Sequence, residues 1–141
     1  MIRMLNHTAD VGFEVAKAPT LEALFDEARR ALLTMVFEVP PERGEYENSV
    51  HLVAPDLETL LVRWINELVF LLQGNGFVPV GTDLRIQKGE EEGFLLEAHL
   101  AGAPLDLEAY GWQGEIKSAT FHGLEVTRES SGWRAQVILD V

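Results

Sequence analysis

The sequence contains no cysteine, which excludes disulfide frameworks, thiolate zinc sites and cysteine nucleophiles. It is also poor in basic residues, with 11 Lys and Arg against 23 Asp and Glu and a formal net charge of −12. Phosphate backbones are bound through counterion release to Lys and Arg, and anionic lipids attract the same residues. We therefore expect neither nucleic acid nor membrane to be bound by charge. A basic protein or a divalent cation suits this chain better.

Long apolar runs are missing as well. The most apolar stretch, residues 57–72, is interrupted by charged and amide side chains: Glu58, Arg63, Asn66 and Glu67. It is therefore not expected to span a membrane. Residues 1–9 have no apolar core of the kind that a signal peptide needs. Together with the absence of disulfides, these features predict a cytoplasmic protein.

The remaining composition is that of a globular protein. The chain has 141 residues, 47% of them hydrophobic, which is enough for one domain spanning residues 1–141 with its own core. Thr20 is placed to cap a helix whose apolar residues recur at helical spacing up to Val36, before Pro40 stops it. Asp56 is placed to cap a second helix, which Gly74 ends.

The two helices carry apolar stripes, Leu24/Phe25/Leu32 and Leu61/Trp64/Leu68, which we expect to face a sheet. Alternating or apolar patterns predict strands at residues 11–15, 49–54, 82–88, 94–100, 123–128 and 133–141. Turns are expected at residues 90–92 and 130–132. A β-α-β-α opening followed by a run of strands favours an α+β fold, in which two helices pack on a largely antiparallel sheet.

The first cluster with chemical potential is His7-Thr8-Ala9-Asp10. A carboxylate beside a hydroxyl and an imidazole suits a metal ion or a phosphate. The alternative is a polar turn in which Thr8 and Asp10 bond nearby backbone amides.

The second cluster is the end of the last strand, Asp140 and Val141. Its side-chain, carbonyl and terminal carboxylate oxygens are the donors that hard cations prefer. With no soft ligand available, calcium or magnesium suits these donors better than zinc. The alternative is a frayed terminus.

A third cluster, residues 115–122, contains Lys117, Thr120 and His122, which suit an anion or a carboxylate of a partner. His51 and His99 lie in predicted strands and are interpreted as structural or surface residues. Arg63 and Glu67 have the spacing of an ion pair on a solvated helix face.

Standard catalytic signatures are absent. The chain has no GxxxxGK[ST] phosphate loop, no GxGxxG, no HExxH and no GxSxG around Ser118. A small metal-dependent hydrolase using Asp10 and Asp140 is one alternative, but the sequence shows no nucleophile for it. The residues alone therefore lead only to an oxygen-ligand metal site.

Taken together, these clusters resemble the archease family. The matching stretches occur in the family's order and span nearly the whole chain: 7–12, 21–25, 60–68, 115–122 and 137–141. The sequence departs from the family pattern at Ala109 and Tyr110, where archeases usually carry Arg and His. It departs also at Phe121, where Tyr is common.

The resemblance implies a non-catalytic protein cofactor of the RtcB-type RNA ligase, which acts in tRNA splicing and RNA repair. Such a cofactor promotes guanylylation of the ligase and its multiple turnover, and meets RNA only through the ligase. The implied metal site is Asp10, Asp140 and Val141. The implied functional surface contains the following residues: His7, Thr8, Lys117, Thr120 and His122. An alternative role is a chaperone-like modulator of RNA-modifying enzymes.

Overall fold

The structure is a computed structural model that describes residues 1–6, 11–91 and 93–141. Its strands form two antiparallel sheets, with the orders β1-β2-β7-β6 and β3-β5-β4. The strands are β1 (Ile2–Asn6), β2 (Val11–Ala18), β3 (Tyr46–Ala54), β4 (Phe77–Lys88), β5 (Phe94–Pro104), β6 (Ser118–Glu129) and β7 (Gly132–Asp140). The α+β class and the antiparallel pairing are confirmed, although the strands divide into two sheets.

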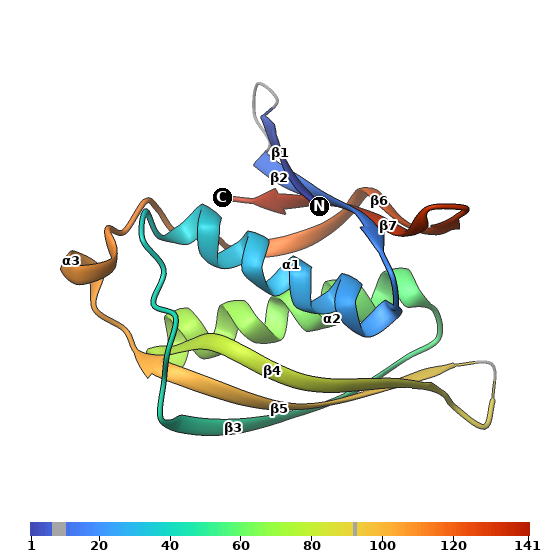
Figure 1. Ribbon diagram of the computed structural model, residues 1–141, viewed down its shortest axis with the longest axis horizontal. Helices are drawn as coiled ribbons and strands as arrows, with labels where there is room; N and C mark the ends of the chain where they lie inside the picture. The colour runs from blue at the N-terminus through green and yellow to red at the C-terminus, as the bar shows by residue number, and fades with distance from the viewer. Residues whose placement is uncertain (7–10, 92) are drawn as a thin grey trace.

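Both long helices, α1 (Leu21–Val36) and α2 (Leu57–Val69), lie between the two sheets (Figure 1). Each helix packs on strands of both sheets, so the core is continuous across three layers. The predicted stripes are confirmed, because all of their members are fully buried: Leu24, Phe25, Leu32, Leu61, Trp64 and Leu68.

The helices begin where the sequence predicts. The Thr20 Oγ1 atom accepts a hydrogen bond from the Ala23 N–H at 3.0 Å, and Asp56 Oδ1 accepts from the Thr59 N–H at 2.7 Å. The hydrogen bonds from Thr59 lower the pKa of Asp56. After Val69 the chain continues as a π-helical turn, η1 (Phe70–Gly74), which the periodicity did not indicate.

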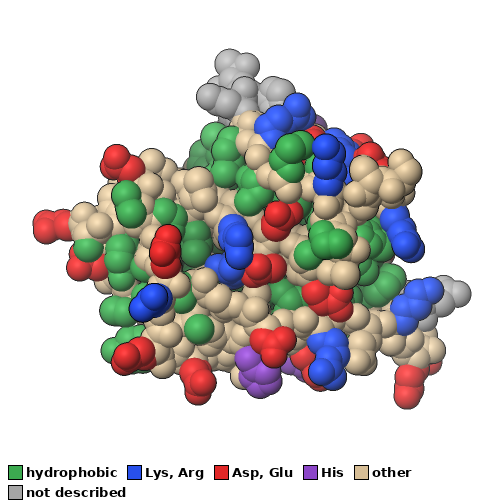
Figure 2. Space-filling view, in the orientation of Figure 1, with side chains coloured by type: hydrophobic (Ala, Val, Ile, Leu, Met, Phe, Trp, Pro, Cys, Tyr) green, Lys and Arg blue, Asp and Glu red, His purple; other side chains and the backbone are tan. Residues whose placement is uncertain are grey.

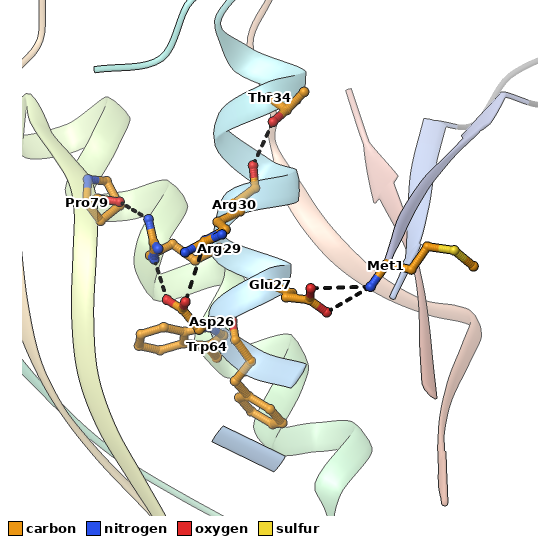
Figure 3. Close-up of polar contacts among 9 residues, drawn as sticks. Met1, Asp26, Glu27, Arg29, Arg30, Thr34, Trp64 and Pro79 are labelled. Atoms are coloured by element: carbon orange, nitrogen blue, oxygen red, sulfur yellow. Dashed lines mark hydrogen bonds and ion pairs between the residues drawn. The ribbon is translucent and has the colours of Figure 1, made fainter. Parts of the chain in front are cut away.

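Strand β4 begins at Phe77, before the predicted start at residue 82. The earlier part was not predicted because Pro79 and Gly81 interrupt the strand pattern, and the register shifts there. The freed Pro79 carbonyl accepts a hydrogen bond from Nη1 of Arg29, a buried side chain of α1, at 3.0 Å. The Nε atom of Arg29 donates to Asp26 Oδ1 at 2.8 Å (Figure 3). The buried Arg29 side chain, held by Asp26 on the same helix, thus ties α1 to the irregular part of the sheet.

Polar helix side chains also cover the edges of the sheets. The edge N–H groups of Ile86 and Ala119 donate to Glu22 Oε2 at 3.1 Å and to Asn66 Oδ1 at 2.7 Å. These contacts protect edges that would otherwise be free to pair with other chains.

The predicted ion pair between Arg63 and Glu67 is wrong. Among the described residues Arg63 forms no ion pair with Glu67, and its Nη1 atom donates instead to the Val53 carbonyl at the edge of β3. The Arg63 side chain is exposed, as predicted, but a carbonyl of the edge strand β3 lies within its reach.

Both predicted hairpin turns are present. The β6–β7 turn falls at residues 130–131, and the Gly89 N–H donates to the Gly93 carbonyl at 2.7 Å across the β4–β5 turn, of which residue 92 is not described. His51 and His99 are exposed on the outer face of the β3-β5-β4 sheet, as predicted for surface residues. No helix within residues 1–6, 11–91 and 93–141 is long and apolar enough to cross a membrane.

Candidate metal and partner-binding site

The end of β7 lies beside the start of β2 and the start of β6. Val11 pairs with Leu139, Ser118 pairs with Asp140, and the Lys117 N–H donates to the Asp140 carbonyl at 2.8 Å. The structure therefore brings three predicted site residues together: Lys117, Asp140 and Val141. The remaining predicted residues of this end lie outside the described residues: His7, Thr8 and Asp10.

The segment before Lys117 is fixed by a side chain that the sequence analysis missed. The Gln73 Nε2 atom donates to the Ile116 carbonyl at 2.7 Å, and the Ile116 N–H donates to Gln73 Oε1 at 2.9 Å. The π-helical turn carries Gln73, and Ile116 is buried. The available signal was an amide following the apolar residues Leu71 and Leu72 at a helix end.

Thr120 and His122 are placed differently from one another. Thr120 Oγ1 donates to the Ile138 carbonyl at 3.1 Å, so its hydroxyl supports the pairing of β6 with β7. The register then shifts between Thr120 and Glu125. In this irregular segment His122 is exposed and Phe121 is 62% exposed. His122 is therefore accessible to a partner.

Glycine allows close packing of β2 against β7 next to this end. A Cβ atom at Gly12 would collide with the Val137 carbonyl oxygen and press on the Ile138 side chain. Ile138 faces away from the core with Gln136, yet it is buried, because Gly12 and Gly123 lie against it. This explains the Gly at position 12 without any reference to a ligand.

Ion pairs neutralise the outer face of the same sheet. Arg134 contacts Glu14 and Glu125, each at 2.9 Å, and Arg3 contacts Glu14 at 3.0 Å. The hydrogen bond from Arg134 lowers the pKa of Glu14 and, together with Arg3, outweighs the opposing effect of burial. On the face shown in Figure 2, acidic and basic side chains are likewise interspersed.

The donors at the end of β7 fit a hard cation in their chemistry. Asp140 and Val141 are exposed and offer oxygen atoms only. In the part of the chain that the structure describes, no three His, Asp or Glu side chains are arranged to hold a metal ion. The predicted ligand set also includes Asp10, which is not described, so the site stays a prediction.

At the family-atypical position 110, the tyrosine has a structural contact. Its hydroxyl donates to the Pro104 carbonyl at 2.9 Å, and its ring packs edge-on against Phe37 with centroids 5.4 Å apart. Both contacts fix the short helix α3 (Leu107–Tyr110) to the body of the molecule.

Similar proteins span the same length. The model of the Archease protein family (MTH1598/TM1083) matches residues 3–141. The chain is 33% identical over 139 residues to the protein archease of Methanosarcina barkeri, covering 97% of this chain and 93% of the relative. It is 34% identical over 136 residues to the protein archease of Pyrobaculum islandicum, covering 96% and 91%.

Two solved structures share the fold. The solution structure of Methanobacterium thermoautotrophicum protein 1598 superposes with a TM-score of 0.76 at 23% identity, covering 99% of this chain and 98% of that one. The crystal structure of a Thermotoga maritima archease, described as a possible chaperone, gives a TM-score of 0.61 at 22% identity, covering 97% and 94%. The family match over almost the entire chain decides the assignment: this protein belongs to the archease family.

Proposed function

We propose that this protein is a non-catalytic cofactor of an RtcB-type RNA ligase, which raises the rate of ligase guanylylation and allows multiple turnover. Membership of the archease family carries the proposal. The main-chain hydrogen bond between Lys117 and Asp140 supports it, because two residues that the family resemblance implies are functional are thereby neighbours at one end of one sheet.

Charge favours the same kind of partner. A ligase that binds RNA and GTP must present basic residues around its active site, and a chain of net charge −12 is attracted to such a surface. Exposed Asp140 and Glu115 lie beside Lys117 at the proposed contact. RNA is contacted only through the ligase, because this chain has few basic side chains to neutralise phosphates.

The proposed divalent-metal site consists of Asp10, Asp140 and Val141, and it favours calcium or magnesium. A cation held there would supply positive charge close to Lys117 without any proton transfer. Calorimetry should show calcium binding to the wild type and at least tenfold weaker binding to Asp140→Ala. Asp83→Ala removes another exposed carboxylate, on the other sheet, and should bind as the wild type does.

The proposal is tested by RNA ligation under multiple-turnover conditions with the RtcB-type ligase of the same organism. A substoichiometric amount of this protein should increase the number of turnovers. The protein alone should neither join RNA ends nor hydrolyse GTP. Ligation or GTP hydrolysis that persists through rigorous purification, or an unchanged turnover number, contradicts the proposal.

A chaperone-like role is the second candidate. It is favoured by the description of the Thermotoga maritima relative as a possible chaperone and by the exposed aromatic side chains of Phe70 and Phe121. This role predicts that the protein suppresses aggregation of heat-treated citrate synthase. The cofactor role predicts no such protection.

A further inference from the structure

A groove of about 380 Å³ lies beside the candidate site, between the β1–β2 pair, the end of α1 and the segment that leads to Lys117. Its apolar lining comes from four separate regions of the chain: Met4, Leu5, Val11, Met35, Ile116 and Val141. In Figure 1 the C-terminus lies beside the β1–β2 pair, near the last turn of α1. The groove therefore adjoins the residues proposed to act on the ligase.

The lining combines a fixed wall with adaptable side chains. Ile116 is held by the two hydrogen bonds from Gln73, and it is buried. Met4 is 43% exposed and Met35 is half-buried. Unbranched methionine side chains adjust to the shape of what they contact, which is why they recur on protein-binding surfaces. Such a groove suits an apolar side chain inserted from outside.

The charged residues at the margin of the groove determine which residues can flank the inserted apolar side chain. Glu115 lines the groove, and Asp140 precedes Val141, which also lines it. Both acidic residues are exposed, and the N–H of Lys117, just before β6, donates to the Asp140 carbonyl. An incoming segment is therefore favoured if a Lys or Arg flanks its apolar side chain.

Other occupants fit this margin less well. Two copies of the chain meeting symmetrically through this surface would place Glu115 and Asp140 near their own duplicates, with like-charge repulsion. An anionic membrane is repelled by the same carboxylates. A partner protein with a basic-apolar segment satisfies both the lining and the margin.

We propose that this groove is a docking site for an apolar side chain, flanked by Lys or Arg, of the partner protein. The identity of that partner as an RtcB-type ligase rests on the proposed function. The apolar anchor would hold the partner in register while Glu115 and Asp140 face its basic residues. Buried apolar anchors of this kind dominate the binding energy of many interfaces.

Calorimetric binding to the ligase tests the groove with matched variants. Met4→Glu places a charge in the groove at an exposed position and should weaken binding at least tenfold. Met4→Leu keeps an apolar side chain and should bind within about threefold of the wild type, by the tolerance expected for similar apolar volumes. Val53→Glu introduces the same charged side chain at an exposed valine of the other sheet and should have no effect.

A second arm uses peptides, so that it does not depend on the ligase. An acetylated Lys-Leu-Leu-Lys peptide at millimolar concentration should shift the amide signals of Gly12, Gly114 and Ile116 in the wild type, and not in Met4→Glu. The matched peptides Glu-Leu-Leu-Glu and Lys-Ser-Ser-Lys should shift them at least tenfold more weakly. Unshifted groove signals, or equal shifts by the acidic peptide, overturn the docking site whatever the ligase does.

The two proposals fail in different ways. If the ligase binds Met4→Glu as tightly as the wild type, the groove is not the contact, while stimulation by the wild type leaves the cofactor role intact. If the wild-type protein neither binds nor stimulates the ligase while the basic peptide occupies the groove, the cofactor role is contradicted and the docking site is supported. Sedimentation showing a wild-type dimer that Met4→Glu dissociates would identify a second copy as the occupant and overturn the partner assignment.

Discussion

At the scale of single residues, Trp64 connects the two helices. Its side chain is fully buried, and its Nε1 atom donates to the Phe25 carbonyl at 2.9 Å. Trp64→Ala should lower the free energy of unfolding by about 3–5 kcal/mol, the range for emptying a buried aromatic site. Chemical denaturation measures this change.

Trp64→Phe separates packing from hydrogen bonding. The variant retains an aromatic ring but removes the side-chain hydrogen bond to the Phe25 carbonyl, and should cost about 1–3 kcal/mol through this loss and the smaller ring. If Trp64→Phe lowers the free energy of unfolding as much as Trp64→Ala does, or if Trp64→Ala leaves it unchanged, this account of the core is contradicted.

Glu14 makes a prediction about acid stability. Its pKa is lower in the folded state because of Arg134 and Arg3, so below the ordinary glutamate pKa the unfolded state binds more protons. Its contribution is therefore complete at neutral pH and is lost as the pH falls through the lowered pKa. Urea denaturation from neutral to acid pH should show a shallower decline in Glu14→Gln. Glu90→Gln removes an exposed glutamate at a turn and should retain the wild-type slope.

Residue roles were predictable where the partner is local in sequence. Thr20 and Asp56 cap helices through an amide three residues away, so spacing alone identified them. Arg29, Arg63 and Gln73 bind main-chain atoms that are distant in sequence, at Pro79, Val53 and Ile116. Nothing in their own neighbourhood marks such partners, so the sequence analysis missed these contacts or assigned them wrongly.

At the scale of elements, η1 positions the segment that carries Lys117. A wider helical turn redirects Gln73 from the helix surface onto the main chain of Ile116. Gln73→Ala should cost about 1–3 kcal/mol, because it removes both partners of buried main-chain groups. Amide hydrogen exchange at Ile116 and Lys117 should accelerate, while exchange in α1 should change only with global stability.

Gln87→Ala is the matched control for this prediction. Gln87 is exposed on β4, so Gln87→Ala should change the free energy of unfolding by less than about 0.5 kcal/mol. Amide hydrogen exchange at Ile116 should not change. Unchanged exchange at Ile116 in Gln73→Ala would show that other contacts hold the segment.

Helices were better predicted than strands for a physical reason. The bounds of α1 follow from a cap, an apolar period and a following proline, which all lie within one continuous segment. β4 was predicted too short because Pro79 and Gly81 disfavour a strand locally, whereas pairing with β5 maintains it. The bulge in β6 after Thr120 has the same origin, since the register with β7 is set by a distant segment.

At the scale of the whole molecule, sequence patterns gave the α+β class but not the division into two sheets. Strand pairing such as β2 with β7 joins segments from opposite ends of the chain, which no local period encodes. The placement of Lys117 beside Asp140 follows from the β6–β7 hairpin, whose pairing continues beyond the predicted strand 123–128 as far as Ser118. His7, Thr8 and Asp10 lie outside the described residues and remain predictions.

The net charge of −12 makes docking sensitive to salt. Raising the ionic strength from about 0.01 M to 0.15 M shortens the Debye length from about 30 Å to 8 Å, so the association rate with the ligase should fall by at least tenfold. The dissociation rate should change less, because the apolar groove is insensitive to salt. Stopped-flow measurements distinguish the two rates, and a salt-independent association rate contradicts electrostatic docking.

The most direct test of the central claim is the rate at which the RtcB-type ligase becomes guanylylated, measured with labelled GTP under single-turnover conditions. Wild-type protein should raise this rate, and the double variant Lys117→Ala/Asp140→Asn should lose at least nine-tenths of the stimulation while unfolding at an unchanged denaturant midpoint. The control Lys88→Ala/Asp83→Asn changes the same residue types in the other sheet and should stimulate as the wild type does. Full stimulation by a folded Lys117→Ala/Asp140→Asn protein, or no stimulation by the wild type, would contradict the account.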